Sequence, residues 1–446
     1  MTCMKTELLS PAGTLKNMRY AFAYGADAVY AGQPRYSLRV RNNEFNKLDI
    51  MAQAIEEAHR LGKRFYLASN ISPHNDKVRS YLRDLEPVIA MQPDALIMSD
   101  PGLIMMVRET WPEQEIHLSV QANAVNYAAV KFWAKQGIRR VILSRELSID
   151  EIAEIRQQCP DVELEVFVHG ALCIAYSGRC LLSGYMTHRD SNQGACTNSC
   201  RWQYNVHDAQ ETDTGDLIAV DVGNSHSNFD QAPAVLLQEK SRPEELLPAY
   251  EDEHGTYIMN SKDLRAVQHV QRLVEIGVES LKIEGRTKSH YYVARTAQIY
   301  RAAIDAAERG EAFNWEWLAE LEHLANRGYT EGFYRRHVPE EYQNYEQGVS
   351  TNPHQQFVGE IIEVNSSDKC LTVEVKNRFC VGDQLQLITP QGNLVFDNFS
   401  MTNGNDEPIS VAPGSGYVVK ILIPDSSGIS NDNLANALLM RFLPDG

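Results

Sequence analysis

Four segments of the chain repeat one short design, in which a glycine or proline turn is followed by an apolar strand. The segments are YGADAVYAG (24–32), MQPDALIMSD (91–100), QGIRRVILSREL (136–147) and IGVESLKIEGR (276–286). Stretches with helical spacing of apolar residues come before them, as in residues 48–61. Gly25, Gly137 and Gly277 therefore stand where a glycine commonly ends a helix. The repeating unit is helix, glycine, strand.

Five further short apolar runs have the composition of strands. They are ELLSP (7–11), RFYLASN (64–70), EIHLSVQ (115–121), ELEVFVH (163–169) and TYIMNS (256–261). Most are continuously apolar rather than alternating, which is typical of strands buried on both faces of a parallel sheet. Their alternation with helices predicts an α/β fold of the TIM-like (β/α)8 barrel type. Nine candidates compete for eight places, so either TYIMNS or ELLSP is expected outside the barrel.

The chain is long enough for more than one domain. We expect a catalytic barrel domain over residues 1–335, with an insertion over 171–255 that is far longer than an ordinary loop. An insertion at the C-terminal end of a strand lies on the face where barrel enzymes hold their active sites. A polar linker is expected over 336–354. Alternating strands separated by Gly, Asn and Pro turns predict a small antiparallel β-barrel over 355–446.

The charge balance limits the partners of the chain. Its formal net charge is −17, which argues against indiscriminate binding to nucleic acid or acidic membranes. A polyanionic partner would have to meet a local basic patch. No apolar run approaches the roughly 18 residues that span a bilayer, and the N-terminal MTCMKTELLSPAG lacks the pattern of a signal peptide. We therefore expect a soluble cytoplasmic protein with no membrane partner.

Four of the eight cysteines are concentrated in the stretch LCIAYSGRCLLSGYMTHRDSNQGACTNSC (172–200). They are Cys173, Cys180, Cys196 and Cys200. In a reducing cytosol such a group more often binds a metal or acts in redox chemistry than forms disulfides. Structural zinc sites usually begin with about two to four residues between the first pair of ligands, which only Cys196 and Cys200 resemble. An iron–sulfur cluster tolerates looser spacing, so it is favoured, and zinc or redox thiols are the alternatives.

A different interpretation makes one cysteine a nucleophile. His169 precedes Cys173 by four residues and could act as its base. This hydrolase interpretation leaves the other three cysteines unexplained. The chain contains no HExxH, GxSxG or Walker A pattern, so metalloprotease, serine hydrolase and P-loop chemistry lose support.

The run EVFVHGALCIAYSGRCLLS (165–183) resembles the signature of the collagenase-like peptidase family U32. Other blocks are similar to further characteristic segments of that family: ELLSPAG, YSLRVRNNEF, SLKIEGRTKS and NRGYTEGFY. The resemblance covers essentially the whole chain, including its C-terminal domain.

The resemblance implies a specific chemistry. Members of this family that modify tRNA, ribosomal RNA or ubiquinone precursors are oxygen-independent hydroxylases with a [4Fe–4S] cluster, and the family's cysteine pattern falls on the four cysteines above. Members that act on tRNA make 5-hydroxyuridine at the wobble position in a prephenate-dependent route. The resemblance thus implies a tRNA uridine 5-hydroxylase that binds tRNA, prephenate or a related carboxylate, and an electron donor protein. A U32-type cysteine peptidase and a non-catalytic RNA-binding protein with structural zinc are the alternatives.

Such a hydroxylase must hold an unstacked uridine and neutralise the neighbouring phosphates. The most basic window of the chain is KIEGRTKSHYYVARTAQIYR (282–301). It offers Lys282, Arg286 and Lys288 as substrate-binding residues. The alternative interpretations are a helix with a solvated basic face and a site for a small carboxylate.

Further candidate substrate-binding residues lie near the ends of expected strands. Arg39 and Arg41 in YSLRVRNNEF would form a fork for a dianion such as prephenate if the segment is extended, and a surface loop is the alternative. Asn123 and Lys262 follow strands of the expected barrel, where polar side chains face the site or cap the next helix. His169 completes the set of candidates.

Overall fold

The computed structural model describes most of both predicted domains. The described residues are 5–38, 43–172, 263–324, 326, 328–335, 355–365, 370–423, 434 and 436–443, together with the backbone of four strands between 204 and 250. Among the helices described, none combines the length and the hydropathy needed to span a bilayer.

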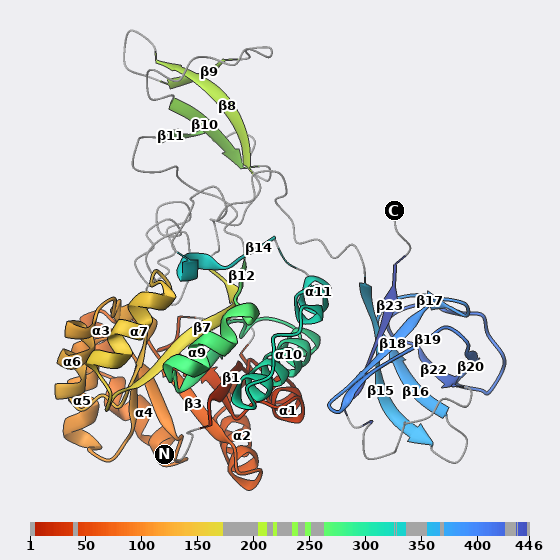
Figure 1. Cartoon of the computed structure of the whole chain (residues 1–446), viewed down its shortest axis with the longest axis horizontal. Helices are drawn as coiled ribbons and strands as arrows, with labels where there is room; N and C mark the ends of the chain where they lie inside the picture. The colour runs from red at the N-terminus through yellow and green to blue at the C-terminus, as the bar shows by residue number, and fades with distance from the viewer. Residues whose placement is uncertain are drawn as a thin grey trace.

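Eight parallel strands form a closed barrel, which confirms the predicted TIM-like fold (Figure 1). They are β1 (Glu7–Pro11), β2 (Ala28–Gly32), β3 (Arg64–Ser69), β4 (Ala95–Met98), β5 (Ile116–Leu118), β6 (Arg140–Ile142), β7 (Glu163–Ala171) and β13 (Ser280–Ile283). The last strand, β13, pairs with both β1 and β7 and so closes the ring. ELLSP is β1 and belongs to the barrel, whereas TYIMNS lies outside the described residues.

Helices surround the barrel and connect its strands (Figure 1). They are α1 (Leu15–Ala23), α2 (Leu48–Arg60), α3 (Asn75–Val78), α4 (Tyr81–Ile89), α5 (Pro101–Thr110), α6 (Tyr127–Lys135), α7 (Ile149–Gln158), α9 (Val270–Ile276) and α10 (His290–Glu308). The side chains of Thr14, Asn126 and Ser289 accept hydrogen bonds from first-turn N–H groups and so begin three of them. Gly277 ends α9 with φ of +87°, as predicted for a helix-ending glycine.

Two short strands extend the sheet beyond the barrel. β12 (Asp263–Arg265) pairs antiparallel with the end of β7, and β14 (Tyr329–Thr330) pairs parallel with β12. The predicted insertion carries a separate antiparallel sheet, in the order β11-β10-β8-β9. Its strands are β8 (Tyr204–Glu211), β9 (Leu217–Val220), β10 (Ala234–Glu239) and β11 (Leu246–Tyr250). The sequence predicted none of these strands, because they are short or lie in polar, turn-rich segments.

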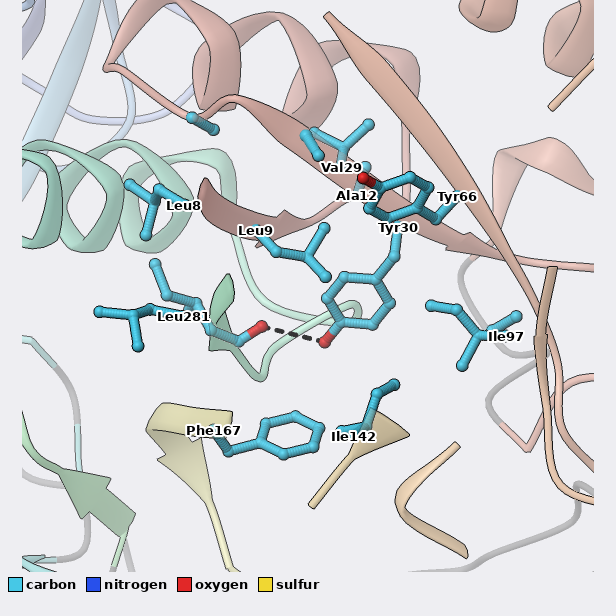
Figure 2. Packing of buried hydrophobic residues seen from close by; sticks show 14 of the residues in the cluster. Leu8, Leu9, Ala12, Val29, Tyr30, Tyr66, Ile97, Ile142, Phe167 and Leu281 are labelled. Atoms are coloured by element: carbon cyan, nitrogen blue, oxygen red, sulfur yellow. Dashed lines mark hydrogen bonds between the residues drawn. The ribbon is translucent and has the colours of Figure 1, made fainter. Parts of the chain in front are cut away.

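The barrel interior is apolar over much of its height. Figure 2 shows the ring of Tyr30 lying near Leu9, Phe167 and Ile142, which come from four different strands. The Tyr30 hydroxyl donates a hydrogen bond to the carbonyl of Ile283 at 3.0 Å. This bond satisfies a polar group that would otherwise be costly to bury.

Near the N-terminal ends of the strands, the interior instead holds charges. The fully buried carboxylate of Glu165 accepts a hydrogen bond from Lys282 Nζ at 2.9 Å and lies 3.4 Å from Arg140 Nη1. Arg140 also contacts Glu7 at 2.5 Å and Glu163 at 2.8 Å. Burial raises the pKa of Glu165, but the charges of Lys282 and Arg140 outweigh that effect and hold it below its ordinary value. The network joins β1, β6, β7 and β13.

The C-terminal domain is a mainly antiparallel sheet with its own apolar core. Its strands are β15 (Gln355–Asn365), β16 (Cys370–Val375), β17 (Phe379–Cys380), β18 (Leu385–Thr389), β19 (Gly392–Phe396), β20 (Ser400–Asn403), β21 (Val411–Ala412), β22 (Val418–Leu422) and β23 (Leu438–Phe442). Seven of them follow the order β19-β18-β23-β15-β16-β22-β20, and β17 pairs with β21. The predicted antiparallel strands are confirmed. Among the residues described, no pairing between β19 and β20 closes the sheet into a barrel.

Apolar packing joins this domain to the first one. Ile388, Leu438 and Met440 belong to the same buried cluster as the barrel core. The ring of Phe357 stacks on Tyr291 of α10, with centroids 5.3 Å apart and planes 8° from parallel. The C-terminal domain therefore covers part of the outer face of α10.

Polar contacts fix the same interface. The Tyr24 hydroxyl lies 3.0 Å from both the Ile388 and the Asn436 carbonyl oxygens. Glu360 accepts from Lys16 at 2.5 Å and lies 3.0 Å from His290 Nε2. Burial raises the pKa of Glu360, but the bonds from His290 and Lys16 outweigh it and lower the pKa to about 2.

The charged interior yields a stability prediction. Glu165→Gln is expected to lower the free energy of unfolding by about 3–5 kcal/mol, because Lys282 and Arg140 would stay buried with one carboxylate fewer. Urea denaturation would measure the loss.

Two controls belong to this test. The double variant Glu165→Met with Lys282→Met is expected to recover most of the stability, since apolar side chains of similar size can replace a buried ion pair. Glu275→Gln affects only exposed contacts, a pair with Arg272 and a hydrogen bond from Gln271, and should change little. A Glu165→Gln protein as stable as the wild type would contradict the assignment.

Candidate active site

The C-terminal ends of the barrel strands carry the candidate site, and the insertion that holds the four cysteines begins there. Strand β7 ends at Ala171, and Asp263, the first residue of β12, pairs with Ala171. The chain therefore leaves for the insertion and returns from it at the same point on the barrel rim. Seven of the predicted site residues lie outside the described part of the chain: Cys173, Cys180, Cys196, Cys200, Arg39, Arg41 and Lys262.

The residues that directly precede the cysteine segment and the arginine segment are described. Leu172 is buried at the end of β7, so Cys173 follows directly from the barrel rim. The N–H group of Leu38, next to Arg39, donates to Asn70 Oδ1 at 3.3 Å, just beyond β3. The structure thus places the roots of the cysteine segment and of the arginine segment at the same end of the barrel. The described residues contain no group of three or more His, Cys, Asp or Glu side chains that could hold a metal ion.

Arg286 lies buried at this end of the barrel. Its Nη1 donates to Ser37 Oγ at 2.6 Å, and its guanidinium carbon is 5.7 Å from the centre of the Tyr30 ring. The absence of a side chain at Gly32 makes room for it, because a Cβ there would lie 2.7 Å from Arg286 Nη1. The guanidinium of Arg286, which is permanently charged, therefore occupies a space that the glycine at position 32 leaves open, above the apolar interior of the barrel.

Lys282 lies deeper, inside the barrel. Its ammonium group is 4.3 Å from the centre of the Tyr30 ring and is paired with Glu165. Burial lowers the pKa of Lys282, and the carboxylate of Glu165 opposes that effect. Lys282 is therefore part of the buried charge network inside the barrel, deeper than Arg286.

The predicted basic window is not a basic surface. Arg295 is fully buried on α10 and pairs with Glu320. Arg301 is largely buried and pairs with Asp27 at 2.9 Å. The interpretation as a helix with a solvated basic face is wrong for these two residues. Lys288 also makes a contact within the window, because its ammonium group lies 5.2 Å from the centre of the Tyr292 ring.

An ion pair that the sequence did not indicate lies beyond the ends of β6 and β13. Arg145, just after β6, contacts Glu284 Oε2 at 3.2 Å and donates to the Ala171 carbonyl at 3.3 Å. Its guanidinium carbon lies 3.9 Å from the centre of the Phe167 ring. The only signal for this pair was the position of each residue just after a strand, in SREL and KIEGR.

Amide side chains gather beyond β3 and β5. Asn70 Nδ2 donates to Gln121 Oε1 at 3.0 Å, and Asn123 Nδ2 donates to the Gln121 carbonyl at 3.1 Å. Asn123 has φ of +53°, a left-handed conformation that asparagine tolerates better than most residues. Its buried Oδ1 has no hydrogen-bond partner within the described part of the chain. The amides supply both donors and acceptors at the rim.

His169 is enclosed by aromatic rings. Its ring centre lies 5.8 Å from that of Tyr292, 5.5 Å from Tyr300 and 5.4 Å from Tyr329. The Tyr300 hydroxyl donates to the Val168 carbonyl, so it accepts from His169 Nδ1 at 3.3 Å, and the proton of the neutral imidazole is on Nδ1.

Burial, with smaller effects from Arg265 and Lys288, lowers the pKa of His169 to about 3. The imidazole is therefore neutral at ordinary pH. Its Nε2 has no hydrogen-bond partner among the residues described.

Comparison with known proteins identifies the family of the chain. Residues 13–344 match the model of peptidase family U32, and residues 353–441 match the model of the family U32 C-terminal domain. The chain belongs to peptidase family U32.

The chain is also similar to proteins of named activity, two of them over nearly its whole length. The chain is 60% identical to tRNA hydroxylation protein P of Escherichia coli K12, over 98% of this chain and 97% of that protein. It is 58% identical to tRNA hydroxylation protein P of Haemophilus influenzae, over 99% of this chain and 97% of that protein. A 23S rRNA 5-hydroxycytidine synthase of Escherichia coli K12 is 32% identical, over 69% of this chain and 41% of that protein.

The enclosure of His169 yields a pH prediction. Its pKa is about 3 in the folded chain against an ordinary 6.5, so the unfolded chain binds the proton first as the pH falls. Stability contributed by neutral His169 is therefore full above pH 6.5 and is lost between pH 6.5 and 3, by up to about 1.4 kcal/mol per pH unit. His169→Gln should flatten the pH dependence of the free energy of unfolding, measured by urea denaturation from pH 7 to pH 5.

His59→Gln is the matched control, because the His59 imidazole is exposed and pairs only with Asp94 at the surface. It should leave the pH dependence close to that of the wild type. Equal slopes for the wild type and His169→Gln would show that His169 is not the residue responsible.

Proposed function

We propose that this protein is a tRNA uridine 5-hydroxylase of the cytoplasm, which acts on the wobble position without molecular oxygen and depends on prephenate. The observation that carries the proposal is the 60% identity to a tRNA hydroxylation protein over 98% of the chain. The position of the cysteine segment supports it, because that segment begins at the rim where barrel enzymes hold their active sites.

A [4Fe–4S] cluster is the proposed cofactor, held by Cys173, Cys180, Cys196 and Cys200. Four thiolates are the donor set that such a cluster requires, and Cys173 continues directly from buried Leu172. When bound, the cluster would supply one-electron chemistry that the amino-acid side chains lack. An electron donor protein would then be a further partner.

The described residues have separate roles in substrate binding. Arg286 is positioned by Ser37 and Gly32 to bind a carboxylate, which suits prephenate. The amides of Gln121 and Asn123 offer a donor and an acceptor, which a uracil edge needs for its O4 and N3–H groups. Arg39, Arg41 and Lys262 would add positive charge for the carboxylate and the flanking phosphates.

The cysteine peptidase alternative finds no support in the environment of His169. A general base must accept the proton of the thiol, but burial lowers the pKa of His169 to about 3, which makes it a weak base, and three tyrosine rings enclose it. The other alternative, an RNA-binding protein with structural zinc, differs in its metal. Elemental analysis of anaerobically purified protein for iron and zinc separates the two.

Replacement of the cysteines tests the proposal directly. Cys173→Ser and Cys196→Ser are each expected to lose the iron and the visible absorbance of the protein together with its activity, because one ligand of the cluster is removed. Nucleoside mass spectrometry of tRNA would measure 5-hydroxyuridine in cells that depend on the variant.

Cys380→Ser is the control, since that cysteine is a free thiol in the C-terminal domain. It should retain both iron and activity. Iron-free protein that still produced 5-hydroxyuridine would overturn the role of the cluster, and tRNA unchanged by loss of the protein would overturn the proposed function.

A second test concerns Arg286. Gly32→Ala would place a Cβ 2.7 Å from Arg286 Nη1 and 2.8 Å from Ser37 Oγ, so the guanidinium must move. Loss of the charged hydrogen bond between Arg286 and the carboxylate of prephenate should lower kcat/KM for prephenate by about tenfold or more. The rate of 5-hydroxyuridine formation at varied prephenate concentrations measures the effect.

Gly404→Ala is a suitable control, because a Cβ there meets nothing within 4 Å. Thermal melting would confirm that both variants are folded. An unchanged dependence on prephenate in Gly32→Ala would remove Arg286 from the carboxylate site.

A further inference from the structure

A pocket of about 320 Å³ lies outside the barrel, where the sheet extension meets α11 (Glu316–Glu322). Its walls come from β12, β14, the turn after β12 and the start of α11. The lining residues are Arg265, Gln268, Trp315, Leu318, Tyr329, Thr330, Glu331 and Arg335. Pockets that hold a small organic ligand begin at roughly this volume.

Trp315 presents an unusually exposed aromatic surface on this pocket. Its relative exposure is 71%, the highest among the large apolar side chains described. Phe313 packs edge-on against it at 5.3 Å and in turn packs against Trp317 at 5.4 Å. Large exposed aromatic side chains commonly mark binding surfaces, and packing from behind holds this one in place.

Cationic and polar groups accompany the indole. The guanidinium carbon of Arg265 lies 4.6 Å from the centre of the Tyr329 ring. Arg335 is 70% exposed and pairs at 2.7 Å with Glu331, which also lies 2.8 Å from His269 Nε2, so an anion can bind Arg335 while His269 keeps Glu331 in place. Gln268 Oε1 is buried and has no hydrogen-bond partner within the residues described. The pocket thus combines a flat aromatic face, an accessible positive charge and an acceptor.

The pocket lies close to the root of the cysteine segment. β12, which contributes Arg265, pairs with the last residues of β7, with Asp263 opposite Ala171. Tyr329, in the wall of the pocket, also contacts His169 of β7. A chain bound at the barrel rim would have to extend past only two short strands to reach the pocket.

We propose that this pocket binds one unstacked nucleotide of the tRNA, other than the nucleotide that is modified. The base stacks on Trp315, its edge bonds to Gln268, and its phosphate pairs with Arg335. The inference rests on the proposed function, because it takes tRNA as the substrate. Stacking suits this chain in particular, since its net charge of −17 repels nucleic acid at long range and a base can bind an aromatic face without a basic surface.

Substitution of Trp315 tests the pocket. Trp315→Ala is expected to weaken binding of tRNA by about tenfold or more, as removal of a stacking partner does elsewhere. KM for tRNA should rise while kcat is retained, since the reacting base is bound at another place. Trp315→Tyr should keep most of the affinity. The probe is bulk tRNA from cells that lack tRNA hydroxylation activity, titrated against the iron-loaded full chain at fixed salt.

Two further variants complete the test. Phe132→Ala removes an aromatic side chain that is 55% exposed on α6 and should leave tRNA binding unchanged. Arg335→Gln should reduce the slope of log affinity against log salt by about one, while Trp315→Ala should leave that slope as it is. These results would support a nucleotide in the pocket.

The outcomes separate this inference from the proposed function. If Trp315→Ala binds tRNA as tightly as the wild type, with an unchanged KM, the pocket is not a nucleotide site, although hydroxylation by the wild type would still support the proposed function. If the wild type neither binds nor hydroxylates tRNA, the proposed function fails and this inference fails with it. Equal losses in Trp315→Ala and Phe132→Ala would indicate a general loss of structure and would also overturn it.

Discussion

Closure of the barrel by β13 is the constraint on which the rest of the structure depends, and the buried pair of Lys282 and Glu165 lies at that closure. The pair connects β13 with the neighbouring strand β7, and its two residues are 117 positions apart in the sequence. Closing a ring across so long an insertion is entropically unfavourable, and a one-residue slip would turn each side chain to the opposite face. The buried charges of Lys282 and Glu165 favour the register in which they meet. The same register sets the height of Arg286, three residues beyond the end of β13.

Much of the fold could be predicted from the sequence, because the eight barrel strands are apolar runs preceded by helices and turns. The extension strands could not, since β12 has three residues and β14 two, too few for a periodic pattern. The site was predictable in part. Arg286 stood out in a basic window, but its partner Ser37 is 249 positions away, and only the folded chain brings the two together.

The basic window illustrates why local pattern misleads at an interface. The window 282–301 holds five cationic residues against a single acidic one, which normally indicates a basic surface. α10, however, lies between the barrel, α11 and the C-terminal domain, so Arg295 meets Glu320 rather than water. A sequence pattern reports which residues share a face of a helix, but it does not report what covers that face.

The interface between the two domains has a consequence for the integrity of the molecule. Ile388, Leu438 and Met440 belong to the same buried cluster as the barrel core, while Glu360 links Lys16 and His290 across the boundary. The peptide connection over 336–354 is therefore not what keeps the halves together. A chain nicked in that connection by a protease should still elute from a sizing column as one particle, and separate only when it unfolds.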